Sequence, residues 1–260
     1  MKQLVILSGK GGTGKTTVAA SLVRLAQNKA LADCDVDAPN LHLIFQPTLV
    51  ASKPFYGYQK AVLNRDACTN CGRCQELCRF GAIANLTVDS LSCEGCGVCE
   101  AFCPAADEHG RPAIRLQDNV TGEVTLGKVE GELFSTATLN MGNGATGKLV
   151  TEVKKNISDR LTSEELFIID GSPGIGCPVM ASITGAHLVL AVAEPSQSGL
   201  HDLERIIQTA KGFGAKCLVC INKYDLNPQI TKKILDYCAQ EEVKPIGKIP
   251  FDPLVSKAVN

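Results

Sequence analysis

Short apolar runs recur in both ends of the chain and alternate with segments in which apolar residues recur every three or four positions. The runs predict buried strands over residues 3–7, 30–33, 166–169, 187–193, 217–222 and 246–249. The helical spacing predicts helices that begin near Thr16, Gly147, Ser198 and Pro228. Strands that alternate with helices in this way predict an α/β fold with a doubly wound, mostly parallel sheet.

The alternation of strands and helices stops after Pro39 and resumes near Gly147. We expect residues 53–115 to form a small inserted α+β domain, and residues 1–52 and 116–260 to form one α/β domain. Between Gly110 and Gly144 the apolar and polar residues alternate, which predicts antiparallel strands that lead back to the larger domain.

Charge and composition limit the expected partners and compartment. The formal net charge is −1, with lysines and arginines spread along the chain, so we expect neither nucleic acid nor a membrane surface as a partner. No apolar run reaches bilayer length and the N-terminus lacks a secretory pattern, which predicts a cytoplasmic protein. In that reducing compartment, 13 cysteines favour metal ligation over disulfides.

Eight of the cysteines form two identical patterns. The pattern CxxCxxCxxxC occurs at Cys68, Cys71, Cys74 and Cys78 and again at Cys93, Cys96, Cys99 and Cys103. This is the spacing of a bacterial ferredoxin with two 4Fe-4S clusters, in which the fourth cysteine of each run binds the other cluster. We therefore assign one cluster to Cys68, Cys71, Cys74 and Cys103, and the other to Cys78, Cys93, Cys96 and Cys99. Zinc is the alternative, but structural zinc prefers separated CxxC pairs.

A further CxxC pair, Cys217 and Cys220, falls inside a predicted strand. Residues three apart in a strand point to opposite faces of the sheet. We expect these two cysteines to be ordinary buried residues, although in Mrp-like ATPases such a pair would suggest a cluster between subunits.

A glycine-rich segment, SGKGGTGKTT, lies between the first predicted strand and the first predicted helix. Its Gly9, Gly14, Lys15 and Thr16 have the spacing of a phosphate-binding loop. Glycines let backbone N–H groups approach a polyphosphate, the lysine reaches the β- and γ-phosphates, and the threonine hydroxyl is placed to bind Mg²⁺. The predicted nucleotide ligands in this loop are Gly9, Lys10, Gly11, Gly12, Thr13, Gly14, Lys15, Thr16 and Thr17. The alternative is a glycine-rich turn that binds nothing.

Carboxylates follow two of the predicted strands. Asp33 and Asp35 lie at the end of the second strand, and Asp170 ends a later strand before a Gly-Pro loop. Ligands of parallel sheets bind at the carboxyl ends of strands, so these aspartates can reach Mg²⁺ or an attacking water molecule. For the first two, a solvated acidic turn is the alternative.

The loop KGGTGKT carries a second lysine, Lys10, and resembles the deviant phosphate loop of the dimeric ATPases that include MinD, ParA and the nitrogenase iron protein. The resemblance covers essentially the whole chain. It implies an ATP-hydrolysing homodimer in which Lys10, Lys15 and Asp35 are catalytic and Lys10 reaches the phosphates of the partner subunit. It also implies that Asp33 supports the water shell of the metal and that Gly174 senses the γ-phosphate. The alternative for Lys10 is a solvated loop lysine.

The segment NKYD, from Asn222 to Asp225, resembles the base-recognition motif of nucleotide-binding proteins. Taken alone the motif indicates guanine, but in the MinD class the equivalent asparagine binds adenine, so we expect ATP. Lys223 belongs to the same predicted site. The resemblance also places Pro250 and Asp252 against the base.

These features predict a MinD-like P-loop ATPase with an inserted two-cluster ferredoxin domain. ATP binding would close a homodimer and reposition the clusters for electron delivery to a partner redox protein or metalloprotein. The alternative is a carrier or scaffold in the assembly of iron-sulfur or other metal cofactors, whose clusters are structural or transferable.

Overall fold

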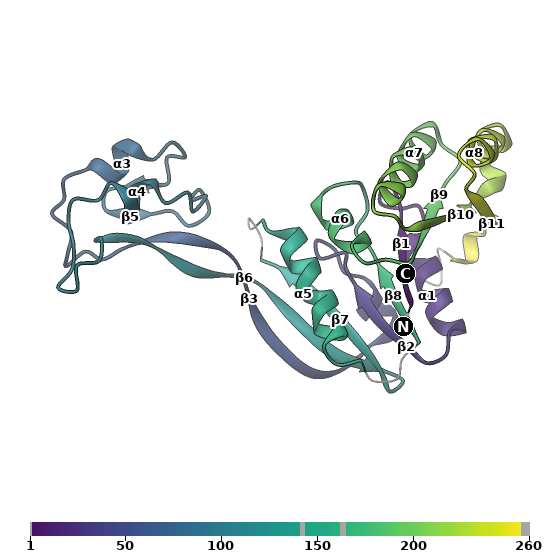
Figure 1. The fold of residues 1–260 in the computed structure, drawn as a ribbon, viewed down its shortest axis with the longest axis horizontal. Coiled ribbons are helices and arrows are strands. Elements are labelled where there is room, and N and C mark those ends of the chain that lie inside the picture. Colours follow the sequence, from purple (N-terminus) through teal and green to yellow (C-terminus); the bar gives the residue numbers. More distant parts are fainter. Residues whose placement is uncertain (1, 141–143, 162–164, 256–260) are drawn as a thin grey trace. The chain divides into compact units, whose positions relative to one another are not determined.

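A computed structural model describes residues 2–140, 144–161 and 165–255 of the chain (Figure 1). The chain divides into two compact units. The first, which we call the sheet unit, comprises Met1–Lys53, Val124–Thr138 and Thr146–Asn260. The second, the cysteine unit, comprises Pro54–Glu123 and Leu139–Ala145.

A mostly parallel sheet organises the sheet unit. Its strands are β1 (Lys2–Leu7), β2 (Lys29–Asp33), β7 (Glu132–Leu139), β8 (Leu166–Asp170), β9 (Leu188–Ala193), β10 (Lys216–Asn222) and β11 (Lys244–Ile249). Two long strands, β3 (Thr48–Leu63) and β6 (Ile114–Val129), complete the order β11-β10-β9-β1-β8-β2-β7-β6-β3. All neighbours from β11 to β7 pair in parallel, and the six predicted strands are confirmed.

The strand β3 was not predicted. It and β6 each run from one unit into the other, so the predicted domain boundaries at 52/53 and 115/116 lie inside continuous strands. Strand β6 turns into β7 through Glu130 and Gly131, which both have positive φ angles of 52° and 92°. This is the conformation of a type I′ hairpin, whose twist matches that of the flanking strands.

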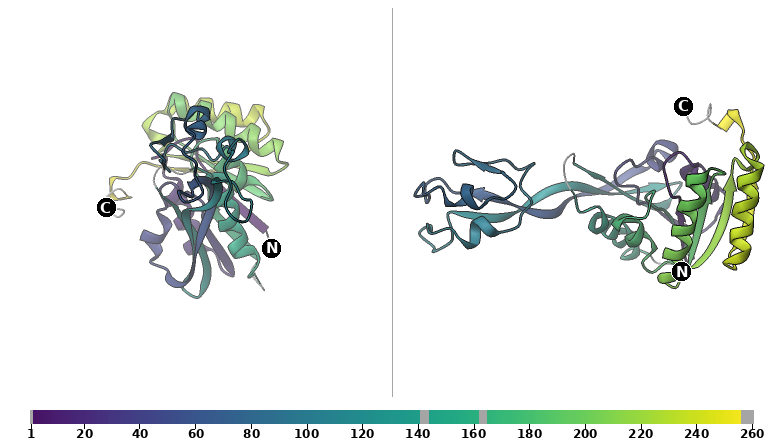
Figure 2. Two further views of the ribbon diagram at one scale, coloured as in Figure 1. Left: turned by 90° about the vertical axis from the view of Figure 1, so that its left-hand side faces the viewer. Right: turned by 90° about the horizontal axis from the view of Figure 1, so that it is seen from above.

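Helices cover both faces of the sheet. They are α1 (Lys15–Leu25), α2 (Leu41–Phe45), α5 (Thr146–Ser158), α6 (Cys177–Ile183), α7 (Gln197–Gly212) and α8 (Pro228–Gln240). Figures 1 and 2 show α7 and α8 side by side against β9, β10 and β11. Ser198 was expected to cap α7, but the cap lies two positions earlier: the Ser196 side chain accepts the Gly199 N–H and acts as the N-cap.

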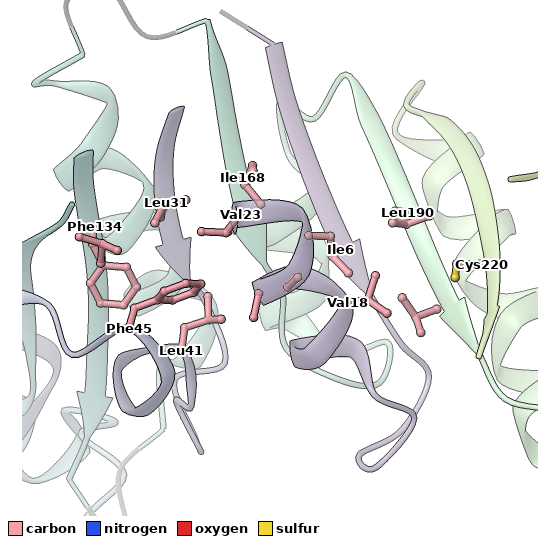
Figure 3. Close-up of a cluster of buried hydrophobic side chains, with 14 residues drawn as sticks. Ile6, Val18, Val23, Leu31, Leu41, Phe45, Phe134, Ile168, Leu190 and Cys220 are labelled. Carbon is pink, nitrogen blue, oxygen red and sulfur yellow. The ribbon is translucent and has the colours of Figure 1, made fainter. Parts of the chain in front are cut away.

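The core beneath α1 and α2 draws on alternate positions of the strands. Ile6, Leu31 and Ile168 point to this face and pack against Val18 and Val23 of α1 (Figure 3). The neighbouring positions in the strands, such as Val5 and Ile169, are equally buried on the opposite face. Burial on both faces is typical of a parallel sheet, and it holds the carboxyl ends of β1, β2, β8 and β10 in register.

The cysteine unit has a small core of its own. It contains α3 (Arg73–Leu77), α4 (Val98–Ala101) and a two-stranded antiparallel pair, β4 (Ile83–Ala84) and β5 (Thr87–Val88). The buried residues of this core are Ala61, Ala82, Ile83, Cys93, Cys99 and Ile114. Two of its six buried residues are thus cysteines. So small a core supplies little stability unless cross-links between its cysteine side chains add to it.

Candidate functional site

The glycine-rich loop connects the carboxyl end of β1 to α1, and two of its glycines are required by geometry. Gly14 has a φ of 87°, and a Cβ there would lie 2.3 Å from Nδ2 of Asn222. A Cβ on Gly9 would lie 1.9 Å from Cβ of Asp202 in α7. Side chains are therefore excluded at both positions, and the loop presents its backbone.

The predicted Mg²⁺ and phosphate residues meet at the base of this loop. Nζ of Lys15 lies 2.6 Å from Oδ1 of Asp170, and Oγ1 of Thr16 donates to Oδ2 of the same carboxylate at 2.9 Å. Lys15 and Asp170 are both buried. The three residues come from the start of α1 and the end of β8, elements brought together by the pairing of β1 with β8.

The carboxylates of this site are poorly solvated. Burial, together with the charge of Asp170, raises the pKa of Asp33 to about 7. Burial also raises the pKa values of Asp35 and Asp170, although Lys15 opposes the change in both. A cation beside these groups would favour their charged forms, which is the expected electrostatic behaviour of a divalent metal site.

Asp33 also has a structural role that the sequence did not reveal. Its Oδ2 accepts the backbone N–H groups of Asn40 and Leu41 at 3.0 and 2.9 Å, and its Oδ1 accepts that of Asp35 at 3.1 Å. The buried carboxylate therefore fixes the path of the chain from β2 into α2 and positions Asp35.

The loop after β8 is tied to the phosphate loop. Gly174 donates its backbone N–H to the carbonyl of Ser8 at 2.9 Å and has a φ of 92°, which favours glycine. Gly174, the predicted γ-phosphate sensor, is thus hydrogen-bonded to the residue directly before Gly9.

Lys10 is bound within its own chain. Its Nζ lies 2.7 Å from the Glu194 carboxylate and donates to Oγ of Ser196 and Ser198 at 3.2 and 3.0 Å. Burial alone would raise the pKa of Glu194, but the bonds and charges of Lys10 and Lys223 hold that pKa below its ordinary value. Sequence reasoning missed Glu194, which follows directly after β9 and is separated from Lys10 by 184 residues.

A cavity of about 680 Å³ opens beside the phosphate loop. The loop, α1, the end of β10 and residues 246–255 line it, and the predicted base-site residues among its lining are Asn222, Lys223, Pro250 and Asp252. Predominantly apolar cavities of this size with a few polar groups are typical of small-molecule sites.

The NKYD residues bind the protein backbone around this cavity. Nδ2 of Asn222 donates to the carbonyl of Thr13 at 2.7 Å, and Nζ of Lys223 donates to that of Gly12 at 2.9 Å. Oδ1 of Asp225 accepts the N–H of Phe251 at 2.7 Å. The first two side chains fix the phosphate loop, and the third fixes the segment that carries Pro250 and Asp252.

Four of the eight patterned cysteines line one pocket in the cysteine unit. They are Cys78, Cys93, Cys96 and Cys99, the set assigned from sequence to one cluster. The backbone N–H of Ala61 donates to Sγ of Cys93 at 3.4 Å. In the other set, the N–H of Asn70 donates to Sγ of Cys68 at 3.4 Å, and Cys71 is exposed. Within the ranges that the structure describes, no three His, Cys, Asp or Glu side chains are grouped so that they could hold a metal ion.

The cysteines of β10 lie on opposite faces of the sheet, as expected. Cys220 packs in the core beneath α1, whereas Cys217 is near Cys238 of α8. Burial raises the pKa of Cys217 to about 12, so its thiol is inert at neutral pH.

Comparison with known proteins identifies the class to which this fold and loop belong. The family model described as the CobQ/CobB/MinD/ParA nucleotide binding domain matches residues 4–260, so the chain belongs to that family. An uncharacterized protein of Methanocaldococcus jannaschii is 34% identical over 231 residues, which cover 86% of this chain and 79% of the relative. An uncharacterized ATP-binding protein of the same organism is 27% identical over 98% of this chain and 76% of its own length.

Solved structures agree in fold. The septum site-determining protein MinD of Pyrococcus horikoshii, complexed with Mg-ADP, has a TM-score of 0.56 and 18% identity over 99% of this chain and 84% of its own. The Cyanothece McdA(D38A)–ATP complex has a TM-score of 0.55 and 18% identity over 100% of this chain and 87% of its own. Such distant identity shows a shared fold only.

None of the helices that the structure describes is both long and apolar enough to cross a membrane.

Proposed function

We propose that this protein is a Mg²⁺-dependent ATPase that works as a dimeric switch and carries two 4Fe-4S clusters. The observation that carries the ATPase proposal is the meeting of Lys15, Thr16 and Asp170 beneath a loop in which two glycines, Gly9 and Gly14, cannot accept side chains. Lys15 would bind the β- and γ-phosphates, and Thr16 with Asp170 would hold Mg²⁺ directly or through water. Membership in the MinD/ParA family supports this assignment.

ATP is favoured over GTP by the bonds of the NKYD segment. A guanine-specific site needs a free carboxylate to accept the N1–H and the exocyclic amine of the base. Asp225 does not line the cavity, and its Oδ1 accepts the N–H of Phe251, so it holds the segment beside the cavity.

Asp35 and Lys10 are the proposed catalytic partners of Lys15. Asp35 is half-buried beside Asp33 and would orient the attacking water. Lys10 would leave Glu194 and contact the phosphates of the partner subunit in a closed dimer, where a cation stabilises charge that develops during phosphoryl transfer.

The cysteine unit fits the proposed clusters. Cys78, Cys93, Cys96 and Cys99 share a pocket, and backbone N–H groups donate to the sulfurs of Cys93 and Cys68. Hydrogen bonds to ligand sulfurs are a regular feature of iron-sulfur sites. In a cubane cluster each of the four thiolates binds a different iron. The ligands therefore surround the cluster and do not meet at one point, as the ligands of a single metal ion do. Bound there, the clusters would supply one-electron transfer to a partner redox protein or metalloprotein.

Anaerobic purification followed by iron, sulfide and turnover measurements tests the proposal. We expect about eight irons and eight sulfides per chain, because two complete sets of four thiolates are present. Mg·ATP should be hydrolysed, and it should change the rate at which reduced protein passes electrons to an artificial acceptor. Stoichiometric zinc without iron, or no change of that rate with ATP, would contradict the coupled switch. Labile clusters that pass to an apo-acceptor would instead indicate a carrier.

A further inference from the structure

Lys60 has an unusual position for a lysine. It is the only lysine between residues 54 and 123, and about nine-tenths of its surface is buried. Its Nζ donates to the backbone carbonyl of Cys93. The next residue, Ala61, lines the pocket of the four cysteines and donates its N–H to Sγ of Cys93 at 3.4 Å. Two consecutive residues of β3 thus bind the same cysteine, one at its carbonyl and one at its sulfur.

Burying an ammonium group beside a neutral carbonyl is costly unless a negative charge compensates it. Asp89 is close enough for its charge to interact with Lys60, but it is exposed and takes hydrogen bonds from Ser92 and Leu91. Glu94 lines the pocket, but it is also exposed. A set of four thiolates around a cluster would place a compensating negative charge directly beside Cys93.

We propose that Lys60 raises the reduction potential of the cluster held by Cys78, Cys93, Cys96 and Cys99, and so makes it the preferred site of the transferred electron. This inference rests on the proposed function, since it requires the clusters. Reduction adds one electron to a cluster that four thiolates already make negative. A nearby buried cation stabilises the reduced form more than the oxidised form, and potentials of these clusters follow net charge, hydrogen bonds and exposure.

Among the described residues, no lysine or arginine near the other cysteine set is buried. Each set has one exposed cysteine, Cys71 here and Cys96 in the other, but no cysteine of this set is buried, whereas Cys93 and Cys99 are. The nearby arginines are both exposed: Arg65 donates to the carbonyl of Leu86 and to Thr87, and Arg73 lies over the ring of Phe102. Solvent therefore screens charge around this set far more than around Cys93. Two clusters with the same ligands would differ in potential because only one has a buried positive charge.

Replacement of Lys60 with glutamine, methionine and arginine tests the proposal. Lys60→Gln can still donate to the Cys93 carbonyl but lacks the charge, Lys60→Met lacks both, and Lys60→Arg keeps the charge. Redox titrations followed by electron paramagnetic resonance would measure both clusters in the purified whole protein. We expect the glutamine and methionine variants to lower the equilibrium constant for reduction of one cluster about tenfold. This corresponds to a fall of about 59 mV in its reduction potential for one electron. The other cluster and the arginine variant should keep wild-type potentials.

Arg65→Gln is the matched control, since it removes an exposed cation from the same unit and should shift neither potential. Adding Lys60→Gln to a Cys68→Ser background identifies the affected cluster, because the remaining signal should still shift. Unchanged potentials in Lys60→Gln with full iron content would overturn the proposal and leave Lys60 a structural role. Wild-type protein that binds no iron would instead refute the proposed clusters themselves.

Discussion

Lys10 forms its shortest polar contact with Glu194, 2.7 Å away in the same chain. A lysine that serves a partner subunit must leave this carboxylate when the dimer closes. Glu194 also receives Nζ of Lys223 at 3.5 Å, and Lys223 in turn binds the carbonyl of Gly12. These contacts link Lys10 to the phosphate loop, and in the proposed dimer the ion pair would have to break before Lys10 could reach the partner subunit.

Glu194→Gln should strengthen ATP-dependent dimerisation. The substitution removes the charge that holds Lys10, and both side chains are partly exposed, so the pair contributes at most about 1 kcal/mol. We expect the dimer dissociation constant with Mg·ATP to fall by about two- to fivefold in analytical ultracentrifugation.

Glu241→Gln is the control for this prediction. It breaks a comparable ion pair, Lys211 of α7 with Glu241, the residue that follows α8, at 2.6 Å. Its dimerisation should match that of the wild type. A Glu194→Gln protein that dimerises less well would show that the carboxylate supports the closed state.

Asp225→Ala should weaken ATP binding without creating a preference for GTP. The loss of the bond to the Phe251 N–H frees the segment around Pro250 and Asp252, and one exposed hydrogen bond of this kind contributes about 1 kcal/mol. Calorimetric titration should show a loss of ATP affinity of about fivefold. Asp236→Ala, an exposed change in α8, should have no effect. Tighter GTP binding in the wild type than ATP binding would contradict the assignment of Asp225.

The sequence was sufficient for features set by local patterns. Six strands, the glycine-rich loop and the position of Asp170 follow from apolar runs and from short motifs, and the structure contains all of them. The strand β3 was missed because most of its residues are exposed and its apolar positions do not alternate regularly. Buried parallel strands form continuous apolar runs, whereas a long edge strand gives a weak signal.

The bonds that give site residues their partners could not be predicted. Lys10 and Glu194 are 184 positions apart, and Lys60 and Cys93 are 33 apart. Such pairs depend on the strand order and on the register between distant segments. No local pattern encodes either, so a motif identifies a lysine or an aspartate without its partner.

The stability of the nucleotide-free protein should fall as pH rises from about 4 to about 7. The pKa of Asp33 is about 7 in the folded protein against an ordinary value of 3.8, so between these values the folded state binds more protons than the unfolded state. This contribution is fully present below the ordinary value and is lost as pH passes the folded value. It amounts to a few kcal/mol at most.

Urea unfolding at several pH values measures the effect. Asp33→Asn should reduce the pH dependence of the unfolding midpoint, and Asp37→Asn, at an exposed position, should not. Mg²⁺ with a non-hydrolysable ATP analogue should reverse the trend above pH 7, because a cation favours the ionised carboxylate. An identical pH dependence in Asp33→Asn would show that other groups determine it.

The last prediction separates a lysine that acts across the dimer from one that acts within its own subunit. Lys15 alone can neutralise the bound phosphates, so Lys10→Ala should leave ATP binding largely intact and lower turnover by orders of magnitude. Asp35→Ala should also be inactive, since the attacking water is no longer oriented.

When the two variants are mixed, a mixed dimer contains one site with an intact Asp35 and with Lys10 from the other subunit. Recovery of ATP hydrolysis in the mixture, well above either variant alone, is the result expected for Lys10 acting across the interface. Mixed dimers that form, as shown by differently tagged subunits, yet remain inactive would place the action of Lys10 within its own chain, beside Glu194.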